Sequence, residues 1–308
     1  MDRTPIGEGV KQQLRSEAGF GCCFCGLPII QYHHILPYSV EVHHRPEDMM
    51  IVCPTCHDKI TKRAVPEFKQ RQAKAKPFNL QRRKVKGLLE INQSFCAIEI
   101  GSALFVGQGP IITINKQEIL GLYLNSVNAL ELSLHLSDES NNSILSIERN
   151  EWISGDYLPW DIKSDWQKLK IRSKARQVLI NIDATRSLIS LQGRLWSFSG
   201  AIKLDKQGVH IDTGSKINVG KAAFINIGIN LSTGESSTNV VSLMNPMMNG
   251  RIDTRDIPVK QMQQEAIADY KIRATQCDME RNILSFHSIQ QPALVAKNGG
   301  TINFGCKS

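Results

Sequence analysis

The chain has 308 residues, which is long enough for two domains that each bury a core. Its composition, 41% hydrophobic and 21% charged, is typical of a soluble globular protein. The sequence contains no apolar run of about 18 residues, so we expect no membrane span. The polar start lacks the apolar segment of a secretory signal, so we expect a cytoplasmic protein whose eight cysteines stay reduced.

The net charge of +8 is concentrated near the N-terminus. Residues 1–87 contain 15 Lys or Arg and 8 Asp or Glu, whereas the rest of the chain contains 22 and 21. Most of the excess lies in residues 58–86, which have 11 basic and 2 acidic side chains. Such a segment is typical of proteins that bind the phosphate backbone of nucleic acids; a solvated basic helix surface is the alternative.

The first predicted element is a short helix over residues 8–18, which are good helix formers. Two C-x-x-C pairs follow it, and their members are Cys22, Cys25, Cys53 and Cys56. Two such pairs in a reduced compartment predict a structural zinc site, because a tight turn directs both sulfurs of each pair toward one point. Accidental cysteines or a redox dithiol are the alternatives. Cys23 is poorly spaced for chelation, so we expect it to pack as a small buried apolar residue.

The 27 residues between the two pairs exceed the roughly 15–20 of a plain two-knuckle zinc module, so a further element is predicted inside the zinc site. This insert contains "YHHILP", with His33 and His34. Its end overlaps "PEDMMIVCPTCHDKIT", in which His57 comes directly after the last cysteine. In this order the motifs resemble HNH nucleases of the ββα-metal fold, in the version that is braced by a four-cysteine zinc site. The resemblance covers about residues 18–63.

The resemblance implies a role for each matched residue. It makes His34 the general base, His33 and His57 the ligands of a catalytic divalent cation (Mg²⁺, Mn²⁺ or Ni²⁺), and Asp48 the residue at the middle position, where Asn is usual. Phosphodiester hydrolysis needs a base that deprotonates water and a Lewis acid that stabilises charge on the leaving oxygen. Imidazoles can fill both roles near neutral pH. The implied products carry 5′-phosphate and 3′-hydroxyl ends.

Three questions remain open for this segment. Neighbouring residues on an ideal strand face opposite sides, so His33 and His34 can share a site only at a strand end or an irregularity. His43 and His44 are rival ligands, although we expect them to be loop residues near the DNA. The whole segment could also be a zinc module that binds nucleic acid without cleaving it.

A second helical stretch is predicted over residues 58–75, where Pro66 should begin, end or kink one of two pieces. The side chains predicted to contact DNA phosphates are Lys59, Lys62, Arg63, Lys69 and Arg71. The helical and charged character fades after residue 80, and we place a domain boundary near residue 90. Residues 1–90 would then form the nuclease domain.

Beyond residue 90 the sequence alternates apolar and polar residues, which predicts short strands. The clearest are residues 130–136, 143–148, 177–183, 187–193, 208–214 and 223–232. A helix is predicted over residues 258–276 and a strand over residues 282–289. The expected fold is therefore α+β, with the zinc-braced HNH domain followed by a larger, mainly β domain over residues 91–308 that forms a sandwich, barrel or solenoid.

The β-rich region carries no motif of its own for catalysis. Three of the four tryptophans lie in residues 150–167, where we expect them to fill a core; exposed rings that stack on a base or bind a partner are the alternative. Its near-neutral charge argues against this region making the main contact with DNA. We expect a sensor or assembly domain that restrains the nuclease, through a regulatory partner or a second copy, as in a restriction or phage-defence effector. A substrate-selecting domain is the alternative.

Overall fold

The computed structural model divides into two compact units, each described by itself. The first is formed within residues 1–89 and 151–179, and the second within residues 90–150 and 180–308. The structure describes residues 4–114, 117–186, 188–197, 200–212, 216–219, 222–225, 228–233, 239–244, 250–253, 276–278, 283–286, 294–295 and 301–304. Assignment of separate functions to residues 1–90 and 91–308 stays a prediction.

A β-β-α framework forms the centre of the first unit. Its elements are β1 (Gln31–His34), the 3₁₀ turn η1 (Pro46–Asp48), β2 (Met49–Val52) and α2 (Pro54–Thr61). The two strands pair antiparallel, with His33 opposite Met50 and His34 opposite Met49. All of β2 is buried, so this strand forms the core of the framework. Pro54 occupies the first turn of α2, where a missing backbone N–H removes no helical hydrogen bond.

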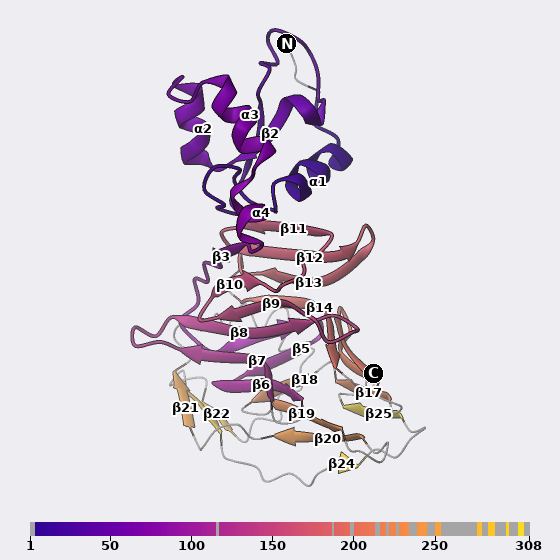
Figure 1. Ribbon diagram of the computed structural model, residues 1–308. Helices are drawn as coiled ribbons and strands as arrows, with labels where there is room; N and C mark the ends of the chain where they lie inside the picture. Colours follow the sequence, from indigo (N-terminus) through magenta and orange to yellow (C-terminus); the bar gives the residue numbers. More distant parts are fainter. Residues whose placement is uncertain are drawn as a thin grey trace. The chain divides into compact units, whose positions relative to one another are not determined.

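Three further helices belong to the first unit: α1 (Glu8–Glu17), α3 (Glu67–Ala75) and α4 (Phe78–Arg82) (Figure 1). The predicted leading helix is confirmed by α1. The predicted helical stretch over residues 58–75 is two helices, since α2 ends at Thr61 and α3 begins directly after Pro66. Proline has no N–H to donate, so it is tolerated before the first turn but not within a helix.

The core of the first unit joins α1 to the framework. Leu14, Ile51 and Ile60 are buried in one cluster, which places the apolar side of α1 against β2 and α2. Cys23 is only 4% exposed in the same cluster, and burial raises the pKa of its thiol to about 12. The prediction that this cysteine packs as a small apolar residue is therefore confirmed.

Residues 151–179 complete the first unit with strands. They contribute β10 (Glu151–Ser154), β11 (Asp161–Asp165) and β12 (Lys168–Lys174), and β10 pairs with β3 (Lys86–Leu88). Gly87 lies opposite Trp152, and a Cβ atom there would be 2.8 Å from the indole nitrogen, so only glycine fits. Trp152 is buried as predicted, whereas Trp160 and Trp166 are 37% and 49% exposed.

The described part of the second unit consists of short strands, many joined to the next by tight turns. Those that carry its described core are β4 (Ala97–Ile100), β5 (Ala103–Val106), β6 (Gly109–Ile114), β7 (Gln117–Leu124), β8 (Leu130–Ser137), β9 (Ser143–Glu148), the end of β13 (Gln177–Asp183), β14 (Ser190–Ser197), β15 (Gly200–Asp205) and β16 (Gly208–Asp212). β6 to β9 form one antiparallel meander and β13 to β16 another. In β8 every second residue is buried, as its alternating sequence predicts.

The remaining described strands are β17 (Lys216–Val219), β18 (Ala222–Ile225), β19 (Gly228–Thr233), β20 (Asn239–Met244), β21 (Gly250–Asp253), β22 (Gln276–Asp278), β23 (Ile283–Phe286), β24 (Leu294–Val295) and β25 (Thr301–Phe304). Thus the predicted larger β-rich region is confirmed. The strand expected over residues 223–232 is two strands, β18 and β19. The helix expected over residues 258–276 lies outside the described residues, apart from Gln276 in β22. No described helix has the length and apolar character that a membrane crossing requires.

Candidate functional site

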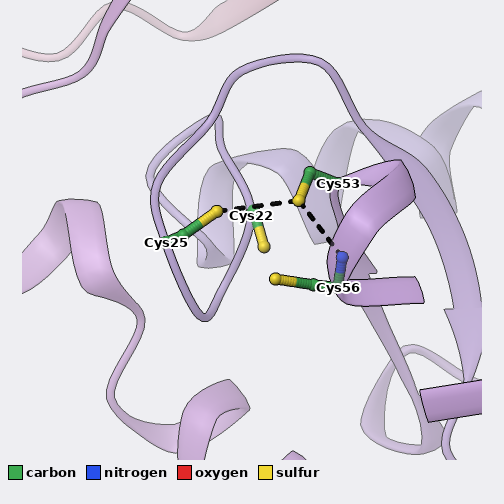
Figure 2. Close-up of side chains that lie close together, drawn as sticks. All are labelled: Cys22, Cys25, Cys53 and Cys56. Carbon is green, nitrogen blue, oxygen red and sulfur yellow. Dashed lines mark hydrogen bonds between the residues drawn. The ribbon is translucent and has the colours of Figure 1, made fainter. Parts of the chain in front are cut away.

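Four cysteine sulfurs converge between two segments of the framework (Figure 2). Cys22 and Cys25 come from the loop after α1, whereas Cys53 caps α2 and Cys56 lies in its first turn. The four Sγ atoms lie within 4.8 Å of one another, and those of Cys25 and Cys53 are 3.6 Å apart. Sulfurs bound tetrahedrally to zinc at about 2.3 Å are separated by about 3.8 Å. The cluster therefore fits the predicted structural zinc ion.

The first cysteine turn is supported by Asn79, which lies outside both cysteine pairs. Gly26 donates its N–H to the Cys22 carbonyl at 2.8 Å and has a φ of +79°, which favours glycine. The buried amide of Asn79, on α4, donates to the Gly26 and Gly19 carbonyls at 3.0 and 3.1 Å. Asn79 was not singled out from the sequence, because nothing in its local pattern indicates a contact more than 50 residues away.

His33 and His57 are brought together at the edge of the framework. Their ring centroids are 5.2 Å apart, in an edge-to-face arrangement. This separation is compatible with two imidazoles that bind one ion. Burial lowers the pKa of His33, the bond to Gln70 opposes this, and the neighbouring His57 and His34 lower it further. The ring is therefore neutral at neutral pH, which is the form that binds a metal. His57 lies within α2, which begins three residues earlier at Pro54.

His34 faces a different set of groups from its neighbour on the strand. Its Nε2 is 3.0 Å from the His43 carbonyl oxygen, and its ring packs edge-on against Tyr38. A carbonyl can only accept, so Nε2 carries the hydrogen and Nδ1 is the unprotonated nitrogen of the neutral ring. This tautomer is the one that a general base backed by a carbonyl requires.

His43 and His44, the rival ligands, act instead as supports of the loop. The Nε2 of His43 is 3.1 Å from the Leu36 carbonyl, and its Nδ1 accepts from the backbone N–H of Arg45 at 3.3 Å. The Nε2 of His44 is 2.9 Å from the Thr4 carbonyl, which leaves its Nδ1 as an acceptor 3.3 Å from the Nε2 of His34. Both nitrogens of each ring thus have partners within the protein.

Asp48, at the middle position of the motif, is held by two arginines. Its Oδ1 accepts from Arg71 Nη2 at 3.0 Å and its Oδ2 from Arg45 Nε at 3.2 Å. The bond from Arg71 lowers the pKa of Asp48 most, and Arg45 lowers it further, so the carboxylate is ionised. The Asp48 carbonyl accepts from the Ile35 N–H at 2.8 Å, which ties it to the residue after His34.

The catalytic and metal-ligating residues predicted from the sequence thus fall into two groups. His33 and His57 share a potential ion site, whereas His34 and Asp48 are bonded to the loop and to α3. Among the described residues, the cysteine quartet alone brings three or more potential ligands together within 4.8 Å. A cation between His33 and His57 would take its other ligands from water and phosphate, as divalent ions at phosphoryl sites do.

The predicted DNA contacts differ in how far their charge is already paired. Lys62 is bonded to Asp58 at 2.9 Å, and Arg71 to Asp48 and Glu67. Lys59, Arg63 and Lys69 are exposed, and within the described part of the chain none has a carboxylate at ion-pair distance. Their role as phosphate contacts stays a prediction.

The strand that carries the histidines has a distant anchor within the same unit. Tyr32 accepts a hydrogen bond from Arg15 of α1, and the Nε and Nη2 of Arg15 donate to the two Asp161 oxygens at 2.8 and 2.9 Å. Both charged groups are buried, at 3% and 1% exposure. Burial opposes the charge of Arg15, but its bonds to Asp161 outweigh this and raise its pKa. Since 146 residues separate the partners, no sequence pattern indicated the pair.

Comparison with protein families adds one match to this geometry. Residues 22–63 match the family model described as HNH endonuclease. This HNH segment contains both cysteine pairs, the candidate histidines and Asp48, and it ends before α3. Comparisons with curated proteins and with solved structures found no match. The predicted HNH segment, zinc-like cysteine cluster and β-rich C-terminal region are therefore confirmed, and the match indicates a function of the nuclease type.

Proposed function

We propose that this protein is a metal-dependent endonuclease that hydrolyses DNA phosphodiester bonds with its HNH segment. The observation that carries the proposal is the end of β1, where His33 meets His57 and the adjacent His34 has the tautomer of a base. A strand end allows neighbouring residues to serve one site, although they face different groups.

In this reaction His34 accepts a proton from the attacking water at its Nδ1. The His43 carbonyl holds the hydrogen on Nε2 and stabilises the positive ring that forms. His33 and His57 would hold a divalent ion, which would supply a Lewis acid for charge on the leaving oxygen. Because Cys56 and His57 are consecutive in α2, the zinc site fixes the helix turn that presents His57.

The donor set bears on the choice of metal. Imidazoles suit transition metals, whereas Mg²⁺ prefers carboxylate and water oxygens. The Asp48 carboxylate is engaged by Arg45 and Arg71, so it does not add an oxygen ligand. Of the three candidate cations, Ni²⁺ should bind more tightly than Mn²⁺, and Mg²⁺ most weakly.

Cleavage of plasmid DNA by the purified full-length protein, with and without EDTA, tests the proposal across Mg²⁺, Mn²⁺ and Ni²⁺. His34→Ala should reduce the rate about 10²–10⁴-fold, the usual contribution of a general base, and leave DNA affinity within about twofold. His135→Ala, a histidine of β8 in the second unit, is the matched control and should cleave normally. End-labelling should find 5′-phosphate and 3′-hydroxyl products.

A non-catalytic, zinc-dependent protein that binds nucleic acid is the competing function. It predicts that the wild type binds DNA in a salt-dependent manner but does not cleave it with any of the three cations. That result would overturn the nuclease proposal, since the zinc cluster and the exposed Lys59, Arg63 and Lys69 would then account for binding alone.

We further propose that the second unit regulates this nuclease, in a restriction or phage-defence effector, with selection of the DNA site as the alternative role. Support comes from its near-neutral, strand-rich sequence beside a basic nuclease segment. Because Leu88 pairs with Glu151, an Asn-Gly turn can join them in place of residues 89–150. Ending the chain at residue 179 then removes the rest of the second unit and keeps residues 151–179. Faster cleavage would support restraint, and loss of site preference would support selection. Plaque counts on cells that express wild type or His34→Ala test a role in defence.

A further inference from the structure

The helix α3 lies beyond the HNH segment, yet it contacts two parts of the candidate site. It begins after Pro66, and two consecutive residues contact the framework: Gln70, which is 7% exposed, and Arg71, which lies at the surface. Gln70 contacts the ring of His33, and Arg71 contacts the carboxylate of Asp48. One turn of this helix therefore bonds to a candidate metal ligand and to the middle position of the motif.

The orientation of the Gln70 amide follows from its second partner. Its Nε2 is 3.1 Å from the Val65 carbonyl, which can only accept, so the NH₂ group must point there. The amide oxygen then faces His33 Nε2 at 3.0 Å. An oxygen needs a donor, so His33 must carry its hydrogen on Nε2.

This bond determines which nitrogen His33 can offer to an ion. With the hydrogen on Nε2, the lone pair of the neutral ring lies on Nδ1. Within the described part of the chain, no hydrogen bond is made to the Nδ1 of His33. The edge-to-face contact with His57 puts a second imidazole beside this ring. Without Gln70, the ring could hold its hydrogen on either nitrogen, and part of the population would present the wrong one.

The second contact of α3 supports the segment that carries the base. Arg71 donates to Asp48 Oδ1, and the Asp48 carbonyl accepts from Ile35, the residue after His34. Glu67, one turn earlier on α3, accepts from Arg71 at 2.9 Å and fixes the direction of the guanidinium group. A carboxylate cannot donate as the usual Asn amide can, so an arginine that binds it takes over the restraint of this segment.

We propose that α3 is a positioning helix of the nuclease site, in which Gln70 selects the Nδ1 of His33 as the metal-binding nitrogen and Arg71 restrains the Asp48 segment behind His34. The metal part rests on the proposed nuclease function, whereas the tautomer of His33 can be measured without metal or DNA.

The first experiment reads that tautomer in the full-length, zinc-loaded protein. Long-range ¹H–¹⁵N spectra distinguish the two imidazole nitrogens, and His33→Gln identifies the His33 signals. The wild type should show His33 with hydrogen on Nε2, and Gln70→Met, which has no acceptor, should show a mixture of tautomers. Gln72→Met makes the same replacement at an exposed residue of α3 and should match the wild type. An unchanged His33 signal in Gln70→Met overturns the role of Gln70.

The second experiment measures binding of Ni²⁺ to the zinc-loaded proteins by calorimetry. Loss of a partner behind a ligating histidine costs about 10–100-fold in metal affinity, so Gln70→Met should bind Ni²⁺ at least tenfold more weakly. Gln70→Glu keeps an acceptor behind the ring and should restore most of this affinity. Equal affinities for Gln70→Met and Gln72→Met would overturn the inference. A wild type that binds no Ni²⁺ would instead overturn the proposed function, while the tautomer result still decides the role of Gln70.

The Arg71 contact is tested by substitution in two backgrounds. Asp48→Asn restores the usual amide at the middle position, which needs no arginine. If Arg71 acts through Asp48, Arg71→Met should lower kcat about tenfold when Asp48 is present. This loss is equivalent to one charge-assisted hydrogen bond of about 1.5 kcal/mol. In the Asp48→Asn background, Arg71→Met should have little effect on kcat. An equal rise of KM in both backgrounds would show that Arg71 contacts DNA directly, and would overturn its positioning role.

Discussion

The cysteine cluster and the histidine site share one β-β-α framework, but they draw support from very different lengths of chain. All four sulfurs come from residues 22–56, and the first turn gains bonds from Phe78 and Asn79 of α4. The histidine site instead depends on Thr4, Gln70 and, through Tyr32 and Arg15, on Asp161. A structural zinc site is closed by its own ligands, whereas an open catalytic site needs other groups to fix its few ligands.

The largest effect should follow loss of one cysteine. Cys56→Ser should abolish zinc binding and unfold the framework, because a structural zinc ion contributes about 10–16 kcal/mol in small zinc modules, which is comparable to the stability of a whole domain. Metal analysis and thermal unfolding measure this. Cys23→Ala replaces a buried cysteine that is not a ligand and should keep one zinc ion per chain. Zinc retained in Cys56→Ser would contradict the assignment of the cluster.

The next effect separates the two sites. Asp161→Asn removes the buried carboxylate that pairs with Arg15 and leaves the exposed Glu8 as its charged partner, which should lower the free energy of unfolding of the first unit by about 3–5 kcal/mol. Zinc content should not change, but DNA cleavage should fall, because Arg15 also holds Tyr32 beside His33. Urea denaturation and metal analysis provide the measurement.

Asp165→Asn is the control, since Asp165 lies exposed at the other end of β11 and asparagine keeps its bond to the Trp166 N–H. It should change the free energy of unfolding by less than about 0.5 kcal/mol. If the two substitutions cost the same, the buried pair does not anchor the histidine strand.

The smallest effect concerns the loop behind the base. His44→Phe keeps a ring to stack on Tyr38 but removes the nitrogen that accepts from His34. The His43 carbonyl remains as an acceptor, so the tautomer of His34 is kept and single-turnover cleavage should fall by less than about tenfold, the value of one net hydrogen bond. A loss as large as that of His34→Ala would mean that His44 itself takes part in the reaction.

The same contrast explains what could be predicted from the sequence. The cysteine spacing predicted the cluster because each C-x-x-C turn defines its own geometry locally. The alternation of residues 130–136 and 143–148 predicted β8 and β9, since one face of each strand is buried. Motif order likewise predicted the HNH segment.

Other features depend on the folded chain and could not be predicted. Gln70 and Asp161 lie in segments whose local pattern is an ordinary basic helix and an ordinary hairpin strand. Their importance arises from burial beside His33 and Arg15, which periodicity does not encode. Trp152 was predicted to fill a core, but no pattern distinguished it from the exposed Trp160 and Trp166.

The position of Asp161 along the chain also affects the timing of synthesis. The ribosome completes the HNH segment at residue 63 and makes Asp161 98 residues later. At about 5–20 residues per second, this delay is about 5–20 s. During that interval Arg15 can pair with Glu8 of its own helix but not with Asp161, so the buried anchor of the histidine strand is incomplete. A nascent chain would thus complete the anchor of its histidine strand only after Asp161 has been translated, which on the proposed function would delay DNA cleavage inside the cell that makes it.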